Sequence, residues 1–367
     1  MRKLFIFCFV WYYNISPIWG QQVETTYHDE EKTVIKEVLQ LKNGLPHGEY
    51  RRYYPEEGLA ELGHFVEGKR QGQFVSFFPH SSDTLKTVYF VDGRRSGAAL
   101  SYHRNGKVAQ EAFFDDDQLQ GDVKNYGENG NLQTVTPFVN NNPHGIKLSY
   151  YEGGGIKESA ELVHGVLEGE TIRYDEEANV RAIINYKNGE LTGASKTFFP
   201  DGTVESEVYY KTGLRHSSYK VYFPDQTIKE EGRYKNGRPH GTFFTYHTNG
   251  QLASASTFKN GVTQGKAISY YSSGKEEKAV YHNKTGQAVK EEEYYENGQL
   301  KKQIAFTNGL ENGKAVFYHE NGKVMEIIPY VLGKISGTHQ RFDQAGKLVE
   351  ETLYENGKIL RAEADGK

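Results

Sequence analysis

A period of 24 residues runs through almost all of this 367-residue chain and limits how it can fold. Its clearest element is a pair of glycines separated by three residues. First glycines lie 24 residues or a multiple apart, with one extra residue between Gly68 and Gly93. The pairs are Gly44 and Gly48, Gly68 and Gly72, Gly93 and Gly97, Gly165 and Gly169, Gly189 and Gly193, Gly237 and Gly241, Gly261 and Gly265, Gly309 and Gly313, and Gly333 and Gly337. Such a period indicates an array in which each unit packs on its neighbours.

Four further copies occupy the remaining phases without the full glycine pair. They span Asp117 to Gly121, Asn141 to Gly145, Gly213 to Ser217 and Thr285 to Val289, which brings the array to thirteen copies.

An aromatic residue stands five places after the second glycine position in every copy. This aromatic row consists of Tyr53, Phe77, Tyr102, Tyr126, Tyr150, Tyr174, Phe198, Tyr222, Tyr246, Tyr270, Tyr294, Tyr318 and Phe342. A second aromatic usually stands three places before the first glycine, as in Phe90 and Tyr234. We expect the rings to form continuous rows, as a structural row or as a binding surface, with offset stacking worth about 1 kcal/mol per pair.

Each copy contains two short stretches in which apolar and polar residues alternate. In the copy that starts at Gly97, Leu100 and Tyr102 alternate with Ser101, and Val108, Ala112 and Phe114 share one parity after the turn at Asn105-Gly106. Alternation over six or seven residues bounded by glycine is typical of a half-buried strand, and Asn-Gly pairs favour tight antiparallel reversals. The paired glycines are therefore interpreted as structural turn residues.

The predicted fold is all-β: one elongated, meandering antiparallel sheet of about 13 tandem hairpins, twisted or coiled because open sheets rarely exceed ~10 strands otherwise. We expect an N-terminal cap segment at 21–40 that contains a lone second strand over 33–41, the array at 41–357, and a polar tail at 358–367 that ends edge pairing.

Composition excludes several classes of function. The net charge of -4 offers no basic surface for nucleic acid. Cys8 is the single cysteine, so thiolate metal sites and cysteine nucleophiles are excluded once the N-terminal segment is removed.

Residues 1–20 are typical of a secretory signal peptide. Arg2 and Lys3 precede an apolar stretch from Leu4 to Tyr13, and Gly20 ends a possible processing site before Gln21. Ten apolar residues are too few to span a bilayer, which needs about 20 in a helix. The chain is therefore expected to be exported, to the periplasm, the outer surface or the medium, without a transmembrane segment after cleavage.

The repeat pattern aromatic-x-Asn-Gly-x-x-x-Gly, clearest from Tyr234 to Gly241 and from Leu41 to Gly48, resembles the MORN repeat. The closest form is the bacterial variant of antitoxin-like proteins of toxin-antitoxin systems, of YwqK type. The resemblance covers about residues 33–357, and it implies hairpins laid edge to edge, a role in protein interaction and scaffolding, and, from the antitoxin label, toxin binding.

Tyrosine pairs such as Tyr150-Tyr151, Tyr270-Tyr271 and Tyr294-Tyr295 give a second resemblance, to cell-wall and choline-binding repeats and to the YD repeats of secreted toxins. That resemblance implies glycan binding by ring stacking. Both tryptophans, Trp11 and Trp19, lie within the signal segment, whereas choline-binding repeats depend on tryptophan cages.

No catalytic motif emerges from the chain. The stretch from Gly261 to Ala267 imitates a phosphate-binding loop but lacks its spacing and its Ser or Thr. Histidines before the second glycine, such as His240, recur about 10 Å apart in adjacent strand pairs, too far for one shared metal. Acidic triplets, such as Asp115 to Asp117, are interpreted as solvated surface.

The sequence therefore predicts a non-catalytic, exported interaction scaffold without cofactor or metal, whose partner is a protein of the cell envelope or the medium. A carbohydrate-binding or cell-wall-binding module using the aromatic row is the alternative, and toxin neutralisation is a third possibility.

Overall fold

The computed structural model describes residues 22–56 and 58–364, which form 36 strands and no helix. The predicted signal peptide lies outside the described residues. The chain divides into two compact units, unit 1 up to Val166 and unit 2 from Leu167 onward, and each is described by itself. None of the described segments is an apolar helix long enough to cross a membrane.

Unit 1 contains fifteen strands. They are β1 (Gln22–Tyr27), β2 (Ile35–Lys42), β3 (Leu45–Tyr53), β4 (Leu59–Val66), β5 (Lys69–Arg70), β6 (Gly72–Phe77), β7 (Thr84–Val91), β8 (Arg94–Tyr102), β9 (Val108–Asp115), β10 (Gln118–Leu119), β11 (Gly121–Tyr126), β12 (Leu132–Val139), β13 (Asn142–Pro143), β14 (Gly145–Tyr150) and β15 (Ile156–Val163).

The remaining strands belong to unit 2, apart from Val166 at the start of β16. They are β16 (Val166–Tyr174), β17 (Val180–Lys187), β18 (Glu190–Leu191), β19 (Gly193–Phe198), β20 (Val204–Lys211), β21 (Leu214–Tyr222), β22 (Ile228–Lys235), β23 (Arg238–Pro239), β24 (Gly241–Tyr246), β25 (Leu252–Lys259), β26 (Val262–Tyr270), β27 (Glu276–His282), β28 (Ala288–Tyr294), β29 (Leu300–Thr307), β30 (Leu310–Glu311), β31 (Gly313–Tyr318), β32 (Val324–Val331), β33 (Lys334–Ile335), β34 (Gly337–Phe342), β35 (Leu348–Glu355) and β36 (Lys358–Ala364).

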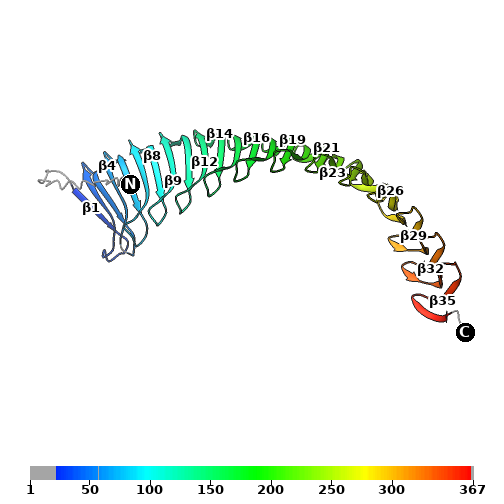
Figure 1. Ribbon diagram of the computed structural model, residues 1–367. Coiled ribbons are helices and arrows are strands. Elements are labelled where there is room, and N and C mark those ends of the chain that lie inside the picture. The colour runs from blue at the N-terminus through cyan, green and yellow to red at the C-terminus, as the bar shows by residue number, and fades with distance from the viewer. Residues whose placement is uncertain (1–21, 57, 365–367) are drawn as a thin grey trace. The chain divides into compact units, whose positions relative to one another are not determined.

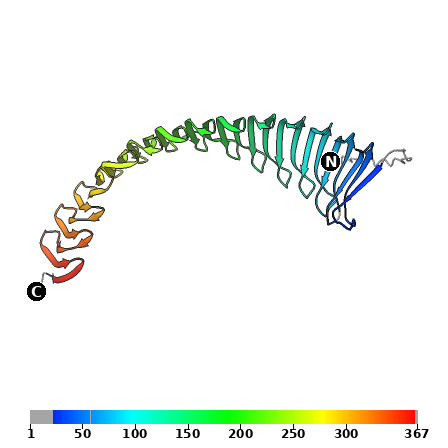
Figure 2. The same cartoon turned by 180° about the vertical axis from the view of Figure 1, so that it is seen from behind.

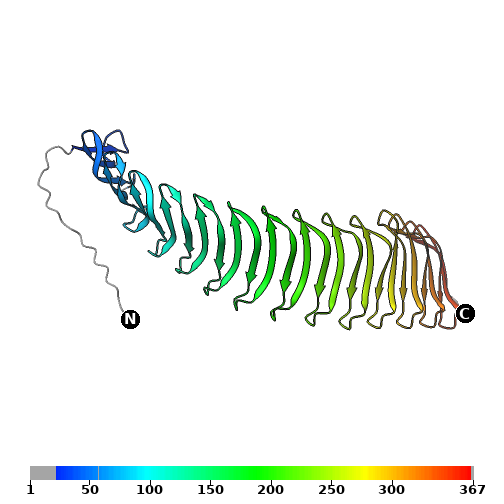
Figure 3. The same ribbon diagram turned by 90° about the horizontal axis from the view of Figure 1, so that it is seen from above.

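Strands in each unit pair antiparallel with the strands next to them in the chain. In unit 1, β8 pairs with β7 and β9, and β9 pairs in turn with β11, so the hairpins lie side by side in an open meander (Figures 1 and 2). The strands of unit 2 also pair in chain order, and within this unit they all curve in the same direction (Figure 3). The predicted all-β fold of tandem antiparallel hairpins is confirmed.

A two-residue turn at the first glycine joins one repeat to the next. Asn236 and Gly237 both have positive φ, 50° and 76°, which is the conformation of a type I′ turn and explains the Asn-Gly preference. The N–H of Gly237 donates to the carbonyl of Arg215 in the preceding turn at 2.9 Å. Equivalent bonds recur along both units, so this corner links consecutive hairpins as well as reversing the chain.

The second glycine lies in a β-bulge. The pairing of β7 with β8 shifts register between Val88 and Phe90, opposite Gly97, whose φ is 108°. In the pairing of β8 with β9, Gly97 lies opposite Phe114, the aromatic residue three places before the next corner. The glycine therefore lies beside that ring. Where Ser217 replaces the glycine, it still adopts a φ of 66°.

A longer turn closes each hairpin after the aromatic row. In the turn after β8 the N–H of His103 donates to the carbonyl of Lys107 at 2.8 Å, and Gly106 has a φ of 80°. The Asn105 side-chain amide donates to the carbonyl of Glu128 in the next such turn at 2.7 Å.

Three expectations about individual copies need correction. No type I′ corner forms at Thr285, because residues 283–287 adopt the longer turn, with the N–H of Asn283 donating to the carbonyl of Gln287 at 2.9 Å. The expected lone strand over 33–41 pairs with β1, which ends in Tyr27, an aromatic at the strand end as in the row but 26 residues before Tyr53. The expected polar tail contains β36, which pairs with β35.

Alternation along the strands separates two faces of each unit. The packed face carries the buried rings, such as Phe74 and Phe90 in unit 1, which are 2% and 8% exposed. The open face carries the residues of opposite parity, such as Tyr89 and Val91 on either side of Phe90. The hydrophobic core thus lies on one face of a single-layer sheet.

Candidate interaction surface

Every member of the aromatic row is the last residue of its strand and is partly exposed. The rings lie on the open face: the Tyr246 hydroxyl donates to Glu231 Oε1 at 2.9 Å, and the pKa of Tyr246 is raised, first by burial and then by that hydrogen bond. The row therefore lies along the strand ends, beside the longer turns. Its rings are partly exposed to solvent.

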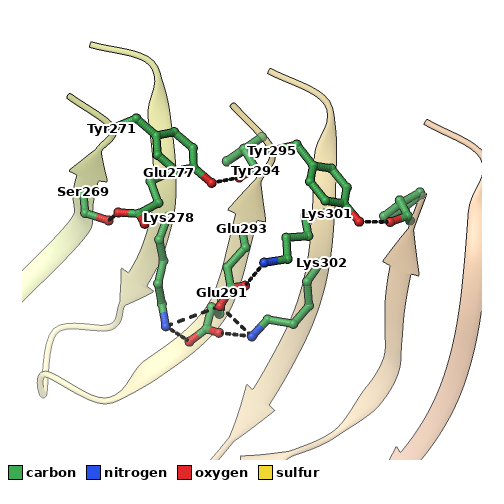
Figure 4. A network of polar contacts seen from close by, with 11 residues as sticks. Ser269, Tyr271, Glu277, Lys278, Glu291, Glu293, Tyr294, Tyr295, Lys301 and Lys302 are labelled. Carbon is green, nitrogen blue, oxygen red and sulfur yellow. Dashed lines mark hydrogen bonds and ion pairs between the residues drawn. The ribbon is translucent and has the colours of Figure 1, made fainter. Parts of the chain in front are cut away.

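Where the residue after the row aromatic is a histidine or tyrosine, its side chain can link one hairpin to the next. The ring Nε2 atoms of His103, His247 and His319 lie 2.8 to 3.1 Å from the carbonyl oxygen of the following row aromatic. Tyr271 and Tyr295 donate from their hydroxyls to the equivalent carbonyls at 2.7 and 2.8 Å (Figure 4). The second tyrosine of these tyrosine pairs is thus a structural link between hairpins.

Close ring contacts gather on the packed face in two clusters of the same geometry. In unit 1, Phe74 lies between Phe65 and Phe90, with ring centroids 5.6 and 5.1 Å away and planes at 87° and 71°. In unit 2, Phe243 lies between Tyr234 and Phe258 at 5.3 and 5.4 Å, with planes at 88° and 82°. Edge-to-face geometry is favoured by the ring quadrupoles.

Both clusters depend on a glycine in the strand next to the central ring. A Cβ atom at Gly63 would lie 2.3 Å from the Phe74 ring, and one at Gly232 would lie 2.4 Å from the Phe243 ring. Neither glycine has positive φ, so space for a ring, not backbone conformation, requires glycine there. Tyr219 completes the second cluster, and its burial, together with the charge of Glu230, raises the pKa of its hydroxyl to about 12.

Charged residues replace the rings on the packed face around β28. Lys302 lies 2.7 Å from Glu291 and 2.8 Å from Glu293, and Lys278 lies 3.0 Å from Glu291 (Figure 4). Burial alone would raise the pKa of Glu291, but hydrogen bonds from the two lysines lower it. The ion pairs therefore stabilise the fold above the ordinary carboxylate pKa, and this contribution is lost as pH falls through the lowered value.

The position before the second glycine usually accepts a hydrogen bond from the next corner. Gln71 Oε1 and Gln120 Oε1 accept from the backbone N–H of Asp92 and Asn140 at 3.0 and 2.8 Å. His216 and His240 occupy the same position, and their Nδ1 atoms are buried without a partner. His47 Nδ1, at the same position, accepts from the N–H of Glu67 only at 3.4 Å, so histidine is a poorer link here than glutamine.

We expect His240→Gln to raise the free energy of unfolding by about 1 kcal/mol, because an amide oxygen can accept the N–H of Asn260, the residue equivalent to Asp92. Native-state hydrogen exchange of the full chain, read in the strands around His240, measures the change. Gln120→His is the reverse exchange and should destabilise unit 1 by a similar amount. Equal stability of His240→Gln and the parent chain would contradict this role for the position.

Within the described residues no group of three or more His, Cys, Asp or Glu side chains is placed to hold a metal ion. His144 and His164 approach each other, with ring centroids 5.5 Å apart, at two corners of unit 1. Asp116 and Asp117, interpreted from the sequence as solvated surface, pair with Arg94 and Arg95.

The open face of unit 1 carries an apolar stripe that the sequence analysis did not single out. It consists of Tyr89, Phe113 and Ile146, which are 46%, 50% and 59% exposed and come from β7, β9 and β14. Two of them, Tyr89 and Phe113, stand directly before a ring of the packed face, as in Phe113-Phe114. Two consecutive aromatic residues in one strand place one ring on each face, and this pattern could have revealed the stripe from the sequence. Asp115 lies on the same face of β9, and Asp122 lies in β11, between Phe113 and Ile146; within the described residues neither forms an ion pair.

Repeated corners, bulges and rings define a scaffold-like tandem β-hairpin repeat protein. The family described as MORN repeat variant matches residues 95–116, 119–140, 191–212, 239–260, 289–308, 311–331 and 336–356. Seven segments of the chain therefore match the MORN repeat variant, in line with the resemblance, whereas the antitoxin-like subtype stays a prediction. Hairpins outside the matched segments share the geometry: β14 and β15 shift register before Tyr150 as β8 and β9 do before Tyr102.

No curated protein matches the chain. Among solved structures it is similar to those described as "Crystal Structure of TcdB2-TccC3-Cdc42", "Crystal Structure of TcdB2-TccC3" and "Crystal Structure of TcdB2-TccC3 without hypervariable C-terminal region". Sequence identities are 13%, 10% and 12%, and TM-scores are 0.14, 0.15 and 0.13. The matches cover 90%, 91% and 90% of this chain and 20%, 20% and 21% of those chains, so it spans about a fifth of their length. Similarity of this degree does not identify a function.

Proposed function

We propose that this protein is an exported, non-catalytic scaffold that binds another protein through its open sheet. The apolar stripe of unit 1 is the observation that carries the proposal. Three large side chains about half exposed, on three of four consecutive hairpins, resemble the core of an interface, where aromatic side chains are enriched. Asp115 and Asp122, which lie on the same face beside these side chains, supply the polar groups that such an interface also contains.

Rigidity of the scaffold supports this use. The corners are joined by backbone hydrogen bonds such as that from Gly93 N–H to the Arg70 carbonyl at 2.9 Å, and the stripe is mounted on strands. A partner therefore meets side chains whose backbone is already ordered, which lowers the entropic cost of binding.

Replacing the stripe residues together, as Tyr89→Ser, Phe113→Ser and Ile146→Thr, is expected to weaken partner binding by about a hundredfold, which corresponds to roughly 2.7 kcal/mol. Cross-linking and affinity purification of the mature protein from the envelope and secreted fractions identify the partner, and titration gives the affinity ratio. A matched variant in unit 2, Val262→Thr with Leu310→Ser and Leu332→Ser, removes exposed apolar residues elsewhere and should leave binding unchanged. Equal loss in both variants would contradict a specific role for the stripe.

Export is part of the proposal and rests on the signal-like residues 1–20. Cell fractionation with N-terminal sequencing should find the mature chain outside the cytoplasm, starting near Gln21. A native chain confined to the cytoplasm would favour toxin neutralisation instead. Glycan binding by the aromatic row is the other alternative, and saturable polysaccharide binding abolished by Tyr246→Ala and Tyr270→Ala would support it.

A further inference from the structure

The packed face of unit 2 contains a place where a ring is missing from a recurring arrangement. Phe74 and Phe243 each stand two places after the second glycine of their repeat. Each lies between two rings, one before the corner on either side. In the repeat of β19 the equivalent position is Ser195, and the rings before the corners on either side are Tyr186 and Tyr210.

A hollow of about 390 Å³ lies at this position, within the size range of binding pockets. Tyr186 and Tyr210 line it together with Ile184, Leu191 and Val208. At its floor the Ser195 hydroxyl oxygen is buried without a hydrogen-bond partner, which costs free energy unless a bound group satisfies it.

The other side of the hollow is polar. Thr197 and Ser206 form a hydroxyl pair with oxygens 2.7 Å apart, and Arg173 and Arg215 also line the space. A ligand that suits both sides has an apolar ring and one polar substituent.

We propose that this hollow, which lies on the packed face and not on the face of the stripe, binds an aromatic side chain of a protein partner, with its ring between Tyr186 and Tyr210 and a polar group at Ser195. The proposal rests on the proposed scaffold function and names the chemistry of the partner. The chain itself supplies the precedent, because Phe74 and Phe243 fill the equivalent places with rings whose centroids lie 5.1 to 5.6 Å from their neighbours.

A second exchange, besides Ser195, distinguishes this repeat from the filled ones. Gly63 and Gly232, which make room for the two internal rings, correspond to Ile184, which pairs with Thr171 in β16. The Ile184 side chain occupies space at the bottom of the hollow that glycine leaves free in the other two repeats. A ring that enters the hollow from solvent therefore contacts the two tyrosines and not the backbone at this position. Changing both residues, Ile184→Gly with Ser195→Phe, recreates the Gly63 and Phe74 arrangement and should fill the hollow from within.

The test uses p-cresol, the side-chain analogue of tyrosine, with the mature chain carrying labelled Ile, Leu and Val methyl groups. Nuclear magnetic resonance titration is expected to shift the methyl signals of Ile184, Leu191 and Val208 at millimolar probe, while Ile304 and Ile328 of other repeats stay unchanged. The filled variant should weaken probe binding by about tenfold or more. Ser195→Ala should keep the binding of toluene and weaken that of p-cresol.

Three results would overturn the assignment. In the first, p-cresol shifts none of the three methyl groups of the parent chain, a readout that does not depend on whether the filled variant folds. In the second, 4-methylcyclohexanol binds as tightly as p-cresol, which would show an apolar site without preference for a ring. In the third, methyl glucoside shifts these methyls and p-cresol does not, which would favour glycan binding. The probe needs no protein partner, so a failure here leaves the scaffold proposal to be judged by the stripe variants.

Discussion

Phe74→Ala is expected to destabilise unit 1 by about 3 kcal/mol, the lower end of the usual cost of deleting a buried phenylalanine. Phe74 is 2% exposed and contacts the rings of Phe65 and Phe90, and the Arg70 guanidinium lies 4.5 Å from its ring centroid. In a single-layer sheet such a cluster is one of few places where side chains are removed from water. Its loss should therefore be felt across several neighbouring hairpins.

Native-state hydrogen exchange is the appropriate measurement, because repeat arrays can open locally and a single unfolding midpoint averages over repeats. Protection should fall first in β4, β6 and β7. Phe77→Ala, which removes a partly exposed ring of the aromatic row in the same repeat, is the matched control and should cost clearly less. Equal losses for the two variants would show that the packed face is not the core.

Gly232→Ala is expected to destabilise unit 2 by about 2 kcal/mol, as overpacking does in well-packed cores. The new methyl group would lie 2.4 to 2.6 Å from three atoms of the Phe243 ring, so the ring must move away from Tyr234 and Phe258. The backbone of Gly232 has no positive φ, so this variant measures packing alone.

Gly250→Ala separates the two reasons for glycine in this chain. A Cβ atom at Gly250 would meet nothing within 4 Å, but its φ is +80°, so the substitution should cost about 1 kcal/mol through backbone conformation only. Combining Gly232→Ala with Phe243→Ala should recover part of the stability lost by the two changes, because the second removes the obstructing ring. Strict additivity of the two changes would contradict direct contact between these positions.

Much of the hairpin architecture could be predicted from sequence because its determinants are local. Asn236-Gly237 specifies a type I′ turn through positive φ at both residues, and alternation between corners specifies a strand. The exceptions also have local causes. Thr285 forms no such corner because Asn283 and Gly286 form the longer turn instead.

Contacts among side chains could not be predicted in the same way. The row of thirteen aromatics is the most regular feature of the sequence, yet the central rings of the two clusters, such as Phe243, lie outside it. Rings on different strands meet only where neighbouring strands bring them to the same face and a small residue leaves space. Gly232 supplies that space from a strand in the preceding hairpin, at a position that the 24-residue pattern does not mark.

By itself the sequence determined the length of the repeat, the two turns that bound each strand and the all-β class. These features are local, because Asn-Gly pairs favour positive φ through the residues of the turn themselves. Only the tertiary structure decided which face is packed, where Tyr89, Phe113 and Ile146 become an exposed stripe, and where Ser195 leaves a hollow between two tyrosines. Those properties arise from the register between strands. The bulge at the second glycine shifts this register and so determines which side chains of neighbouring strands lie opposite each other.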